Sequence, residues 1–125
     1  MSLSPASRAK LETCDPRLVA VVLAVAEHSR FVVVCGHRGQ ADQDRAVARG
    51  ASRTPWPTSR HNSTPSEAVD LAPLDATGAV DWEDRQAFAV LAGAVLHAAA
   101  VRGVRLEWGG HWPSFPDLPH FQLAR

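Results

Sequence analysis

The stretch that decides the fold class runs from Val104 to Leu123 and reads VRLEW, GGHWPSFPDLP and HFQL. Strand-forming residues at its two ends flank a segment rich in glycine and proline, so it predicts two strands with no helix between them. Strands and helices therefore do not alternate as regular βαβ units. We expect an α+β fold with a small, largely antiparallel sheet and flanking helices.

The chain before this stretch predicts three helices, two strands and one long loop. A helix over residues 16–29 is expected after Asp15, which suits an N-cap. The longest helix should begin at Asp81, which together with Asp84 three residues later resembles a capping box. It should end at Gly103. The remaining elements are a helix over 41–49 closed by Gly50, strands over 31–35 and 68–72, and a proline-rich loop over 51–67.

Length and composition limit the classes of protein that need considering. The chain has 125 residues, the usual size of one domain, so we expect a single domain over residues 1–125 and a monomer. Thirteen basic residues balance thirteen acidic ones, which argues against binding of nucleic acid or of an anionic membrane by general electrostatics. The longest apolar run is too short to span a bilayer and no signal-peptide pattern is present, so we expect a soluble protein made in the cytoplasm.

Three residues with metal-binding side chains lie at the edges of predicted elements: His61 in the long loop, Asp70 on the strand after it and His120 on the last strand. A catalytic zinc takes three protein ligands and keeps a fourth position for water, which two histidines and one carboxylate satisfy. The spacing alone is not specific, because short motifs often match by chance. Cys14 and Cys35 form no CxxC pair, so we expect core or near-core thiols and neither a disulfide framework nor a thiolate zinc site.

Several short motifs add specificity because of their order along the chain. They read GHR at 36–38 with Gln43 and Gly50, SRH at 59–61, AVDLAP at 68–73, DW at 81–82, WGGHW at 108–112 and FPDLPHF at 115–121. Together they resemble the D-alanyl-D-alanine and L-alanyl-D-glutamate zinc peptidases, which include small phage endolysins and share their fold with the hedgehog signalling domain. The resemblance covers the chain from about Phe31 to its end.

The resemblance implies roles for individual residues. It implies zinc bound by the two histidines and the aspartate named above, Asp117 as the acid/base residue and Arg38 as the residue that meets the substrate or the developing oxyanion. The chemistry agrees, because a carboxylate beside the metal can accept a proton from the attacking water and a guanidinium is a permanent cation with a planar fork. Glu107 is the rival base.

Four further residues are candidates for substrate binding, each with a second interpretation. Ser59 contacts substrate or caps its loop, and Gln43 contacts substrate or faces solvent. Trp108, which with Trp112 flanks the diglycine, forms a pocket wall or packs in the core. His111, where relatives often carry aspartate, is a pocket residue, a surrogate ligand or an inert loop histidine.

The resemblance also implies a function. We expect a zinc-dependent peptidase that cuts peptidoglycan stem peptides between L-alanine and D-glutamate as a phage endolysin, held in the host cytoplasm before lysis and acting on the wall in the periplasm. A D-alanyl-D-alanine carboxypeptidase is the alternative among enzymes. A non-catalytic wall- or partner-binding module of the same fold is the alternative among binding proteins, and Asp117 argues against it because such a module needs no base.

Overall fold

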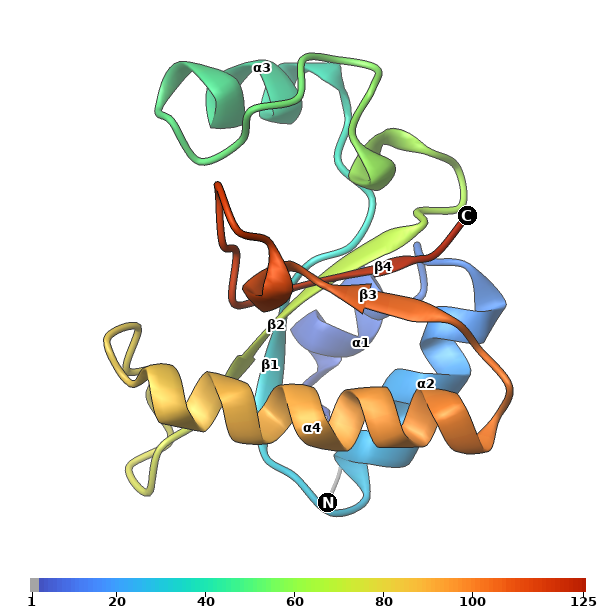
Figure 1. Ribbon diagram of the computed structural model, residues 1–125, viewed down its shortest axis with the longest axis vertical. Coiled ribbons are helices and arrows are strands. Elements are labelled where there is room, and N and C mark those ends of the chain that lie inside the picture. The colour runs from blue at the N-terminus through green and yellow to red at the C-terminus, as the bar shows by residue number, and fades with distance from the viewer. Residues whose placement is uncertain (1–2) are drawn as a thin grey trace.

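One four-stranded sheet organises the structure, a computed structural model that describes residues 3–125. Its strand order is β1-β2-β4-β3, and each neighbouring pair is antiparallel (Figure 1). The strands are β1 (Phe31–Cys35), β2 (Ala68–Pro73), β3 (Leu106–Trp108) and β4 (His120–Leu123). The α+β fold and the antiparallel sheet predicted from the sequence are confirmed.

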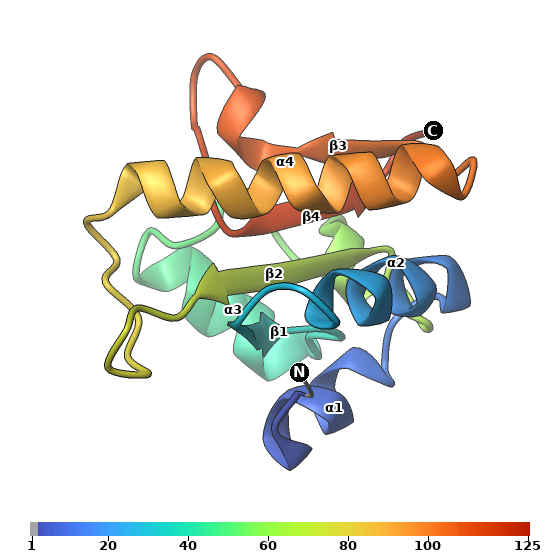
Figure 2. The ribbon, with the colours of Figure 1, turned by 90° about the horizontal axis from the view of Figure 1, so that it is seen from below.

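Three of the four described α-helices pack against the sheet or against one another, and the fourth lies apart. The α-helices are α1 (Pro5–Leu11), α2 (Pro16–Ala26), α3 (Gln40–Ala48) and α4 (Arg85–Val101), and the 3-10 helices are η1 (Arg60–Asn62) and η2 (Gly109–His111). Helix α4 runs along the sheet with α2 packed beside it, whereas α3 lies apart from both (Figures 1 and 2). Within residues 3–125, no helix combines the length and the apolarity needed to cross a membrane.

Helix α1 is the α-helix that the sequence patterns do not predict. Ser4 caps it by accepting a hydrogen bond from the Ser7 backbone at 3.1 Å, and Pro5 occupies its first turn. Only Ser7 and Leu11 of its seven residues are buried. A helix this short has no apolar stripe of helical period, which is the signal that sequence analysis relies on.

The long helix begins later than predicted. Its N-cap is Asp84, whose side chain accepts from the Ala87 backbone at 3.0 Å, and not Asp81. The Asp81 carboxylate accepts instead from the Glu83 backbone two residues on, at 3.0 Å. This local bond closes a turn, which competes with helix initiation at Asp81.

The turn between α1 and α2 is bonded to two later segments. The Thr13 hydroxyl accepts from the His37 backbone at 2.8 Å, and the Thr13 carbonyl accepts from the Ser66 backbone at 2.9 Å. The Asp15 backbone in turn donates to the Ser66 carbonyl at 2.9 Å. Gly36 packs so closely here that a side chain at this position would collide with the Thr13 hydroxyl.

The two faces of the sheet have different contents because successive strand residues point to opposite sides. Val69 and Leu71 of β2 and Phe121 and Leu123 of β4 join the apolar core with residues of α2 and α4. The intervening residues of these strands face the other way, and they include Asp70. The sheet register places Asp70 directly opposite His120, so the polar residues of β2 and β4 meet on one face.

Candidate metal centre and groove

A groove of about 760 Å³ lies over the polar face of the sheet. One wall consists of the end of α3 and the segment after it, and the other consists of the loop that leads into β4 (Figure 1). His61, Asp70, Asp117 and His120 all line the groove, as does Arg38. The structure therefore brings the five residues predicted as ligands and catalytic groups into one cavity.

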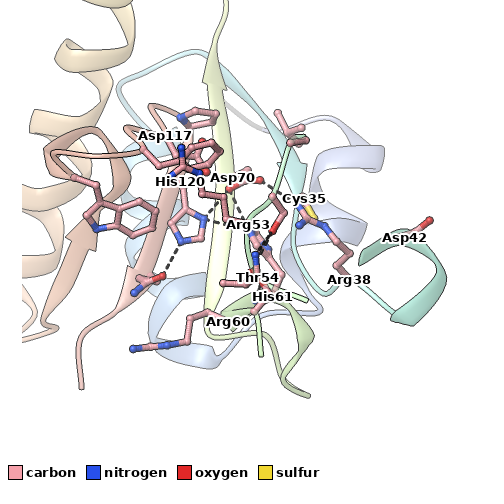
Figure 3. Close-up of a pocket in the computed structure, with 18 of the residues that line it drawn as sticks. Cys35, Arg38, Asp42, Arg53, Thr54, Arg60, His61, Asp70, Asp117 and His120 are labelled. Atoms are coloured by element: carbon pink, nitrogen blue, oxygen red, sulfur yellow. Dashed lines mark hydrogen bonds and ion pairs between the residues drawn. The ribbon is translucent and has the colours of Figure 1, made fainter. Parts of the chain in front are cut away.

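Three donor atoms form a compact triangle in the groove. His61 Nε2 lies 3.2 Å from Asp70 Oδ1 and 3.3 Å from His120 Nδ1, and His120 Nδ1 lies 3.2 Å from Asp70 Oδ1. Figure 3 shows the three side chains turned toward one another. His61 and His120 are only 2% and 6% exposed, so most of the surface of both imidazole rings is covered by protein.

Each histidine is oriented by a bond from its other ring nitrogen. His61 Nδ1 lies 2.8 Å from the Gly36 carbonyl, and His120 Nε2 lies 2.8 Å from Gln122 Oε1. These acceptors hold a proton on the outer nitrogen, which leaves the inner nitrogen free to donate electrons to a metal. Gln122 was not identified from the sequence, although its position two residues after His120 on the same strand face would have indicated it.

The triangle has the dimensions of a metal site. Four ligands at about 2.0–2.1 Å from a zinc ion in tetrahedral geometry lie about 3.3 Å from one another. The three measured separations of 3.2, 3.3 and 3.2 Å agree with this value. Two imidazoles and one carboxylate are also a ligand set that catalytic zinc uses, so the residues present fit a metal ion of this kind.

The thiol of Cys35 lies at the edge of the same site. Its Sγ, a His61 nitrogen and an Asp70 oxygen all lie within 4.8 Å of one another, a second group that could hold a metal. Both cysteines are free, as the sequence predicts, and Cys14 is buried. Cys35 is only half-buried. The spacing of the two cysteines does not predict its position beside the metal donors, because that position follows from the pairing of β1 with β2.

Asp70 controls the protonation of the site. Burial disfavours the charged imidazole, but the charge and hydrogen bond of Asp70 outweigh it and raise the pKa of His61 to about 10. Burial likewise disfavours the Asp70 carboxylate, yet His61 and His120 hold its pKa well below the usual range. The metal-free folded site therefore pairs an ionised Asp70 with a protonated His61 at neutral pH.

Asp117 is held next to the triangle by the close approach of Gly109. The Asp117 backbone donates to the Gly109 carbonyl at 2.9 Å, and the His120 backbone donates to the Asp117 carbonyl at 3.2 Å. A Cβ at residue 109 would lie 3.0 Å from the Asp117 Cβ and 3.1 Å from the His120 Cβ, so only glycine fits without displacement. Burial and the negative charge of Asp70 raise the pKa of Asp117, as befits a base that must take up a proton.

Arg38 is positioned from three sides. Its Nη2 lies 3.6 Å from Asp70 Oδ2, its Nη1 donates to Gln43 Oε1 at 3.1 Å, and its backbone N–H donates to the His61 carbonyl at 2.8 Å. The Asn62 amide donates to the Arg38 carbonyl at 3.0 Å. The guanidinium is therefore fixed beside the metal donors.

Ser59 and Gln43 have well-defined structural roles. Ser59 caps η1 by accepting from the His61 backbone at 3.2 Å, and its own N–H donates to Asn62 Oδ1 at 3.0 Å. Gln43 is fully buried, and its amide oxygen accepts from Arg38 and Asn62. A direct contact of either residue with substrate stays a prediction. Ser59 lines the groove, whereas Gln43 is buried and is not among the groove-lining residues.

The tryptophans divide between core and groove. Trp108 packs against the apolar core and donates from Nε1 to the Leu118 carbonyl at 2.7 Å, and His111 packs edge-on against it at 4.9 Å. Neither is among the groove-lining residues, whereas Trp112 is, with its ring 5.1 Å from that of His120. Glu107, the rival base, is exposed and also outside the groove lining.

One groove on this α+β fold holds a metal-type donor triangle, a carboxylate and an arginine, which are the groups that a hydrolase uses to activate water and to stabilise a developing oxyanion. The model of the phage L-alanyl-D-glutamate peptidase family matches residues 1–122. This chain belongs to that family and is a peptidase, which confirms the resemblance seen in the sequence.

Two relatives agree with this assignment. The L-alanyl-D-glutamate peptidase of Escherichia phage T5 is 31% identical over 121 residues, which cover 95% of this chain and 86% of that protein. The crystal structure of the Serratia marcescens L-Ala D-Glu endopeptidase ChiX superimposes with a TM-score of 0.85 at 36% identity, covering 99% of this chain and 90% of the other. The fold is therefore shared over almost the whole length.

Proposed function

We propose that the chain hydrolyses the bond between L-alanine and D-glutamate in peptidoglycan stem peptides, with zinc held by His61, Asp70 and His120. The observation that carries the proposal is the donor triangle, whose three sides of 3.2–3.3 Å suit a tetrahedral ion. Family membership supports the choice of bond, because the matching family and both relatives carry that activity in their names.

A zinc ion held here would supply a Lewis acid that polarises the scissile carbonyl and makes water a better nucleophile at neutral pH. The protein side of the chemistry starts with positioning. The half-buried Trp112 and the nearly closed floor of the groove exclude bulk water from one side of the reacting bond. Electrostatic interactions are stronger in such a water-poor site.

Asp117 is the proton carrier in this proposal. Its carboxylate lines the groove beside His120, on a loop anchored at Gly109. It accepts a proton from the attacking water and returns it to the leaving amine. The raised pKa of Asp117 favours this exchange, because a carboxyl group with a higher pKa holds the transferred proton more readily.

Arg38 is the electrostatic partner of the carbonyl. Its guanidinium is already fixed beside Asp70 and Gln43, so no reorganisation is needed when negative charge develops on the carbonyl oxygen. The same cation balances the charge of Asp70 when the groove is empty of substrate.

Digestion of purified peptidoglycan followed by mass spectrometry tests the proposed bond. We expect new stem fragments that begin with D-glutamate and a matching free carboxyl end on L-alanine. Release of D-alanine alone would instead identify a carboxypeptidase, and intact peptidoglycan would contradict both. Metal analysis of the purified protein should give about one zinc per chain, and another stoichiometric ion would contradict the choice of metal.

Location and assembly belong to the same proposal. A phage enzyme with this substrate is expected in the host cytoplasm before lysis and on the wall in the periplasm during it, and we expect it to act as a monomer. Fractionation of infected cells and light scattering of the purified protein test these two expectations.

A further inference from the structure

An arginine and an aromatic ring connect the two walls of the groove. Arg53 follows α3 on one wall, and Phe115 lies on the loop of the other wall. The Arg53 Cζ lies over the Phe115 ring, 4.2 Å from its centroid. Figure 3 draws Arg53 among the side chains around His61, Asp70 and His120. The Arg53 cation therefore lines the same groove as the donor triangle, and within the described part of the chain no hydrogen bond joins it to the triangle.

The backbone on both sides of Arg53 is held from beneath. Gln43 Nε2 donates to Ser52 Oγ at 3.0 Å and to the Thr54 carbonyl at 2.6 Å. Ser52 Oγ also accepts from the Thr54 backbone at 3.2 Å. Because Gln43 is fully buried and also bonded to Arg38, the position of Arg53 is coupled to that of the arginine beside the metal donors.

Arg53 differs from Arg38 and Arg60 in its polar partners, and from the equally exposed Arg49 in being stacked on an aromatic ring. Arg38 faces Asp70 at 3.6 Å, and Arg60 faces Glu67 at 3.4 Å. Within residues 3–125, the Arg53 side chain makes no ion pair and no hydrogen bond, and it is exposed. Stacking on an aromatic face restrains a guanidinium but leaves its in-plane N–H groups free, and these fit the two oxygens of a carboxylate.

We propose that Arg53, stacked on Phe115, is a specificity-determining residue that binds the free carboxylate of the D-glutamyl residue next to the cleaved bond. The proposal rests on the proposed function, because it assigns this carboxylate from the L-alanyl-D-glutamate substrate. D-Glutamate has two carboxyl groups, of which the stem peptide continues through one. The other is either free or amidated, and a planar cation discriminates between these two forms because the amide is uncharged and offers only one acceptor oxygen.

The test compares two synthetic peptides of the form acetyl-L-alanyl-γ-D-glutamyl-L-lysine. One has the free α-carboxyl group on D-glutamate, and its twin has a carboxamide there. We expect the parent enzyme to prefer the free acid by roughly 10- to 100-fold in kcat/KM, mainly through KM, the range that a charge-assisted bidentate contact provides. Arg53→Gln should bring the ratio of the two substrates close to one, because kcat/KM falls mainly for the free acid.

Two further variants separate shape from charge. Arg53→Lys keeps the charge but loses the fork, so we expect it to recover only part of the preference. Arg105→Gln removes the same charge from an exposed site outside the groove and should keep the full preference. Thermal melting of each variant reports whether the fold is retained.

The outcomes distinguish this inference from the proposed function. If the parent cleaves both peptides equally, or if Arg53→Gln lowers both rates by the same factor, Arg53 only connects the walls and the inference is wrong while the proposed function stands. If the parent cleaves neither peptide nor peptidoglycan, the proposed function itself fails. Calorimetric binding of the D-glutamyl-L-lysine product, with and without its α-amide, gives the same comparison without turnover.

Discussion

The two faces of β2 and β4 are built from alternate residues of the same strands, yet one face forms the apolar core and the other forms the floor of the groove. On one face Leu71 and Phe121 are 0% and 1% exposed and pack against α2 and α4. On the other face Asp70 and His120 form part of the donor triangle. His120 is also only 6% exposed, so both faces are well buried. They differ in that the buried polar atoms of the groove face need hydrogen-bond partners, whereas the apolar side chains of the core face do not.

The difference shows how a small domain keeps a polar centre next to its core. Within residues 3–125, every buried side-chain nitrogen or oxygen has a hydrogen-bond partner. Apolar side chains on the core face depend on shape and area, whereas each polar group on the groove face depends on one or two named partners. Variants on the two faces should therefore separate activity from stability, with effects on turnover that decrease from the metal ligands to the apolar core.

Removing a ligand from the groove face should abolish activity. His61→Ala should leave metal content and cleavage below detection, because two remaining donors hold the ion poorly. Metal analysis and digestion of peptidoglycan measure the two effects, and a chelator should reproduce them in the parent. His28→Ala, an exposed histidine outside the groove, should change neither. Full activity of the parent in excess chelator would rule out a metal-dependent mechanism.

Removing the base should spare the metal. Asp117→Asn keeps size and shape, so we expect one bound metal and a native melting curve while cleavage falls by roughly 10²- to 10⁴-fold. Glu107→Gln is the matched control, since this carboxylate is exposed and outside the groove lining. Parent-like turnover by Asp117→Asn together with an inactive Glu107→Gln would reverse the assignment of the base.

Removing the Arg38 guanidinium should lower the rate of cleavage without unfolding the chain. Arg38→Ala should bind metal and lose on the order of 10²-fold in kcat, the usual effect of losing one donor to a developing oxyanion. Arg38→Lys keeps the charge and should lose less. Since Gln43 and Asp70 also contact Arg38, circular dichroism must show that the fold persists. Unchanged kcat in a folded Arg38→Ala would remove Arg38 from the mechanism.

Truncating the core face should have the opposite result. Leu71→Ala should lower the free energy of unfolding by about 2–5 kcal/mol, the usual range for a buried leucine. Its kcat should stay near the parent value at temperatures where the variant is folded. Urea unfolding and kinetics on the same preparation make the comparison. A large loss of kcat in fully folded protein would show that the two faces are not separable.

Metal binding should release protons without any change in the fold. The raised pKa of His61, about 10, means that the metal-free site holds a proton at pH 8 that a metal must displace. Titration calorimetry in two buffers of different ionisation enthalpy should give about one proton per metal, with weaker affinity as the pH falls. Binding with no proton release at pH 8 would contradict the His61–Asp70 pairing.

The same shift has a defined sign for the stability of the metal-free protein. The folded pKa of His61 lies above its ordinary value of 6.5. Its protonation therefore stabilises the fold fully below pH 6.5, and this contribution is lost as the pH rises through about 10. Unfolding of metal-free protein between pH 6 and pH 10 measures the loss.

Periodicity and caps were enough to predict most elements, and motif order predicted the residues that meet in the groove. Strands β1 and β4 and the start of α2 at Asp15 follow local signals that tertiary contacts do not override. Helix α1 and the cap of α4 at Asp84 were missed or displaced because single turn-forming bonds decide them.

The supporting contacts of the site could not be predicted, because they join segments far apart in the chain. The Gly36 carbonyl that orients His61 is 25 positions away, and Arg53 meets Phe115 only after the sheet has formed. The sequence does not distinguish Trp108 from Trp112 as a wall of the groove. In the structure, a hydrogen bond from Trp108 Nε1 to the Leu118 carbonyl holds the Trp108 ring toward the core. Only Gln122 carried a usable signal, through strand alternation.

The contacts of the turn between α1 and α2 determine how far the chain can be shortened from its N-terminal side without loss of activity. Thr13 and Asp15 bond the segments at His37 and Ser66, and Gly36, whose carbonyl orients His61, packs against Thr13. A shortened chain that starts at Pro16 would keep every residue of the groove, yet it would lose these anchors. For protein engineering, residues 4–15 therefore belong to the minimal catalytic unit, and a fusion partner should be attached ahead of them.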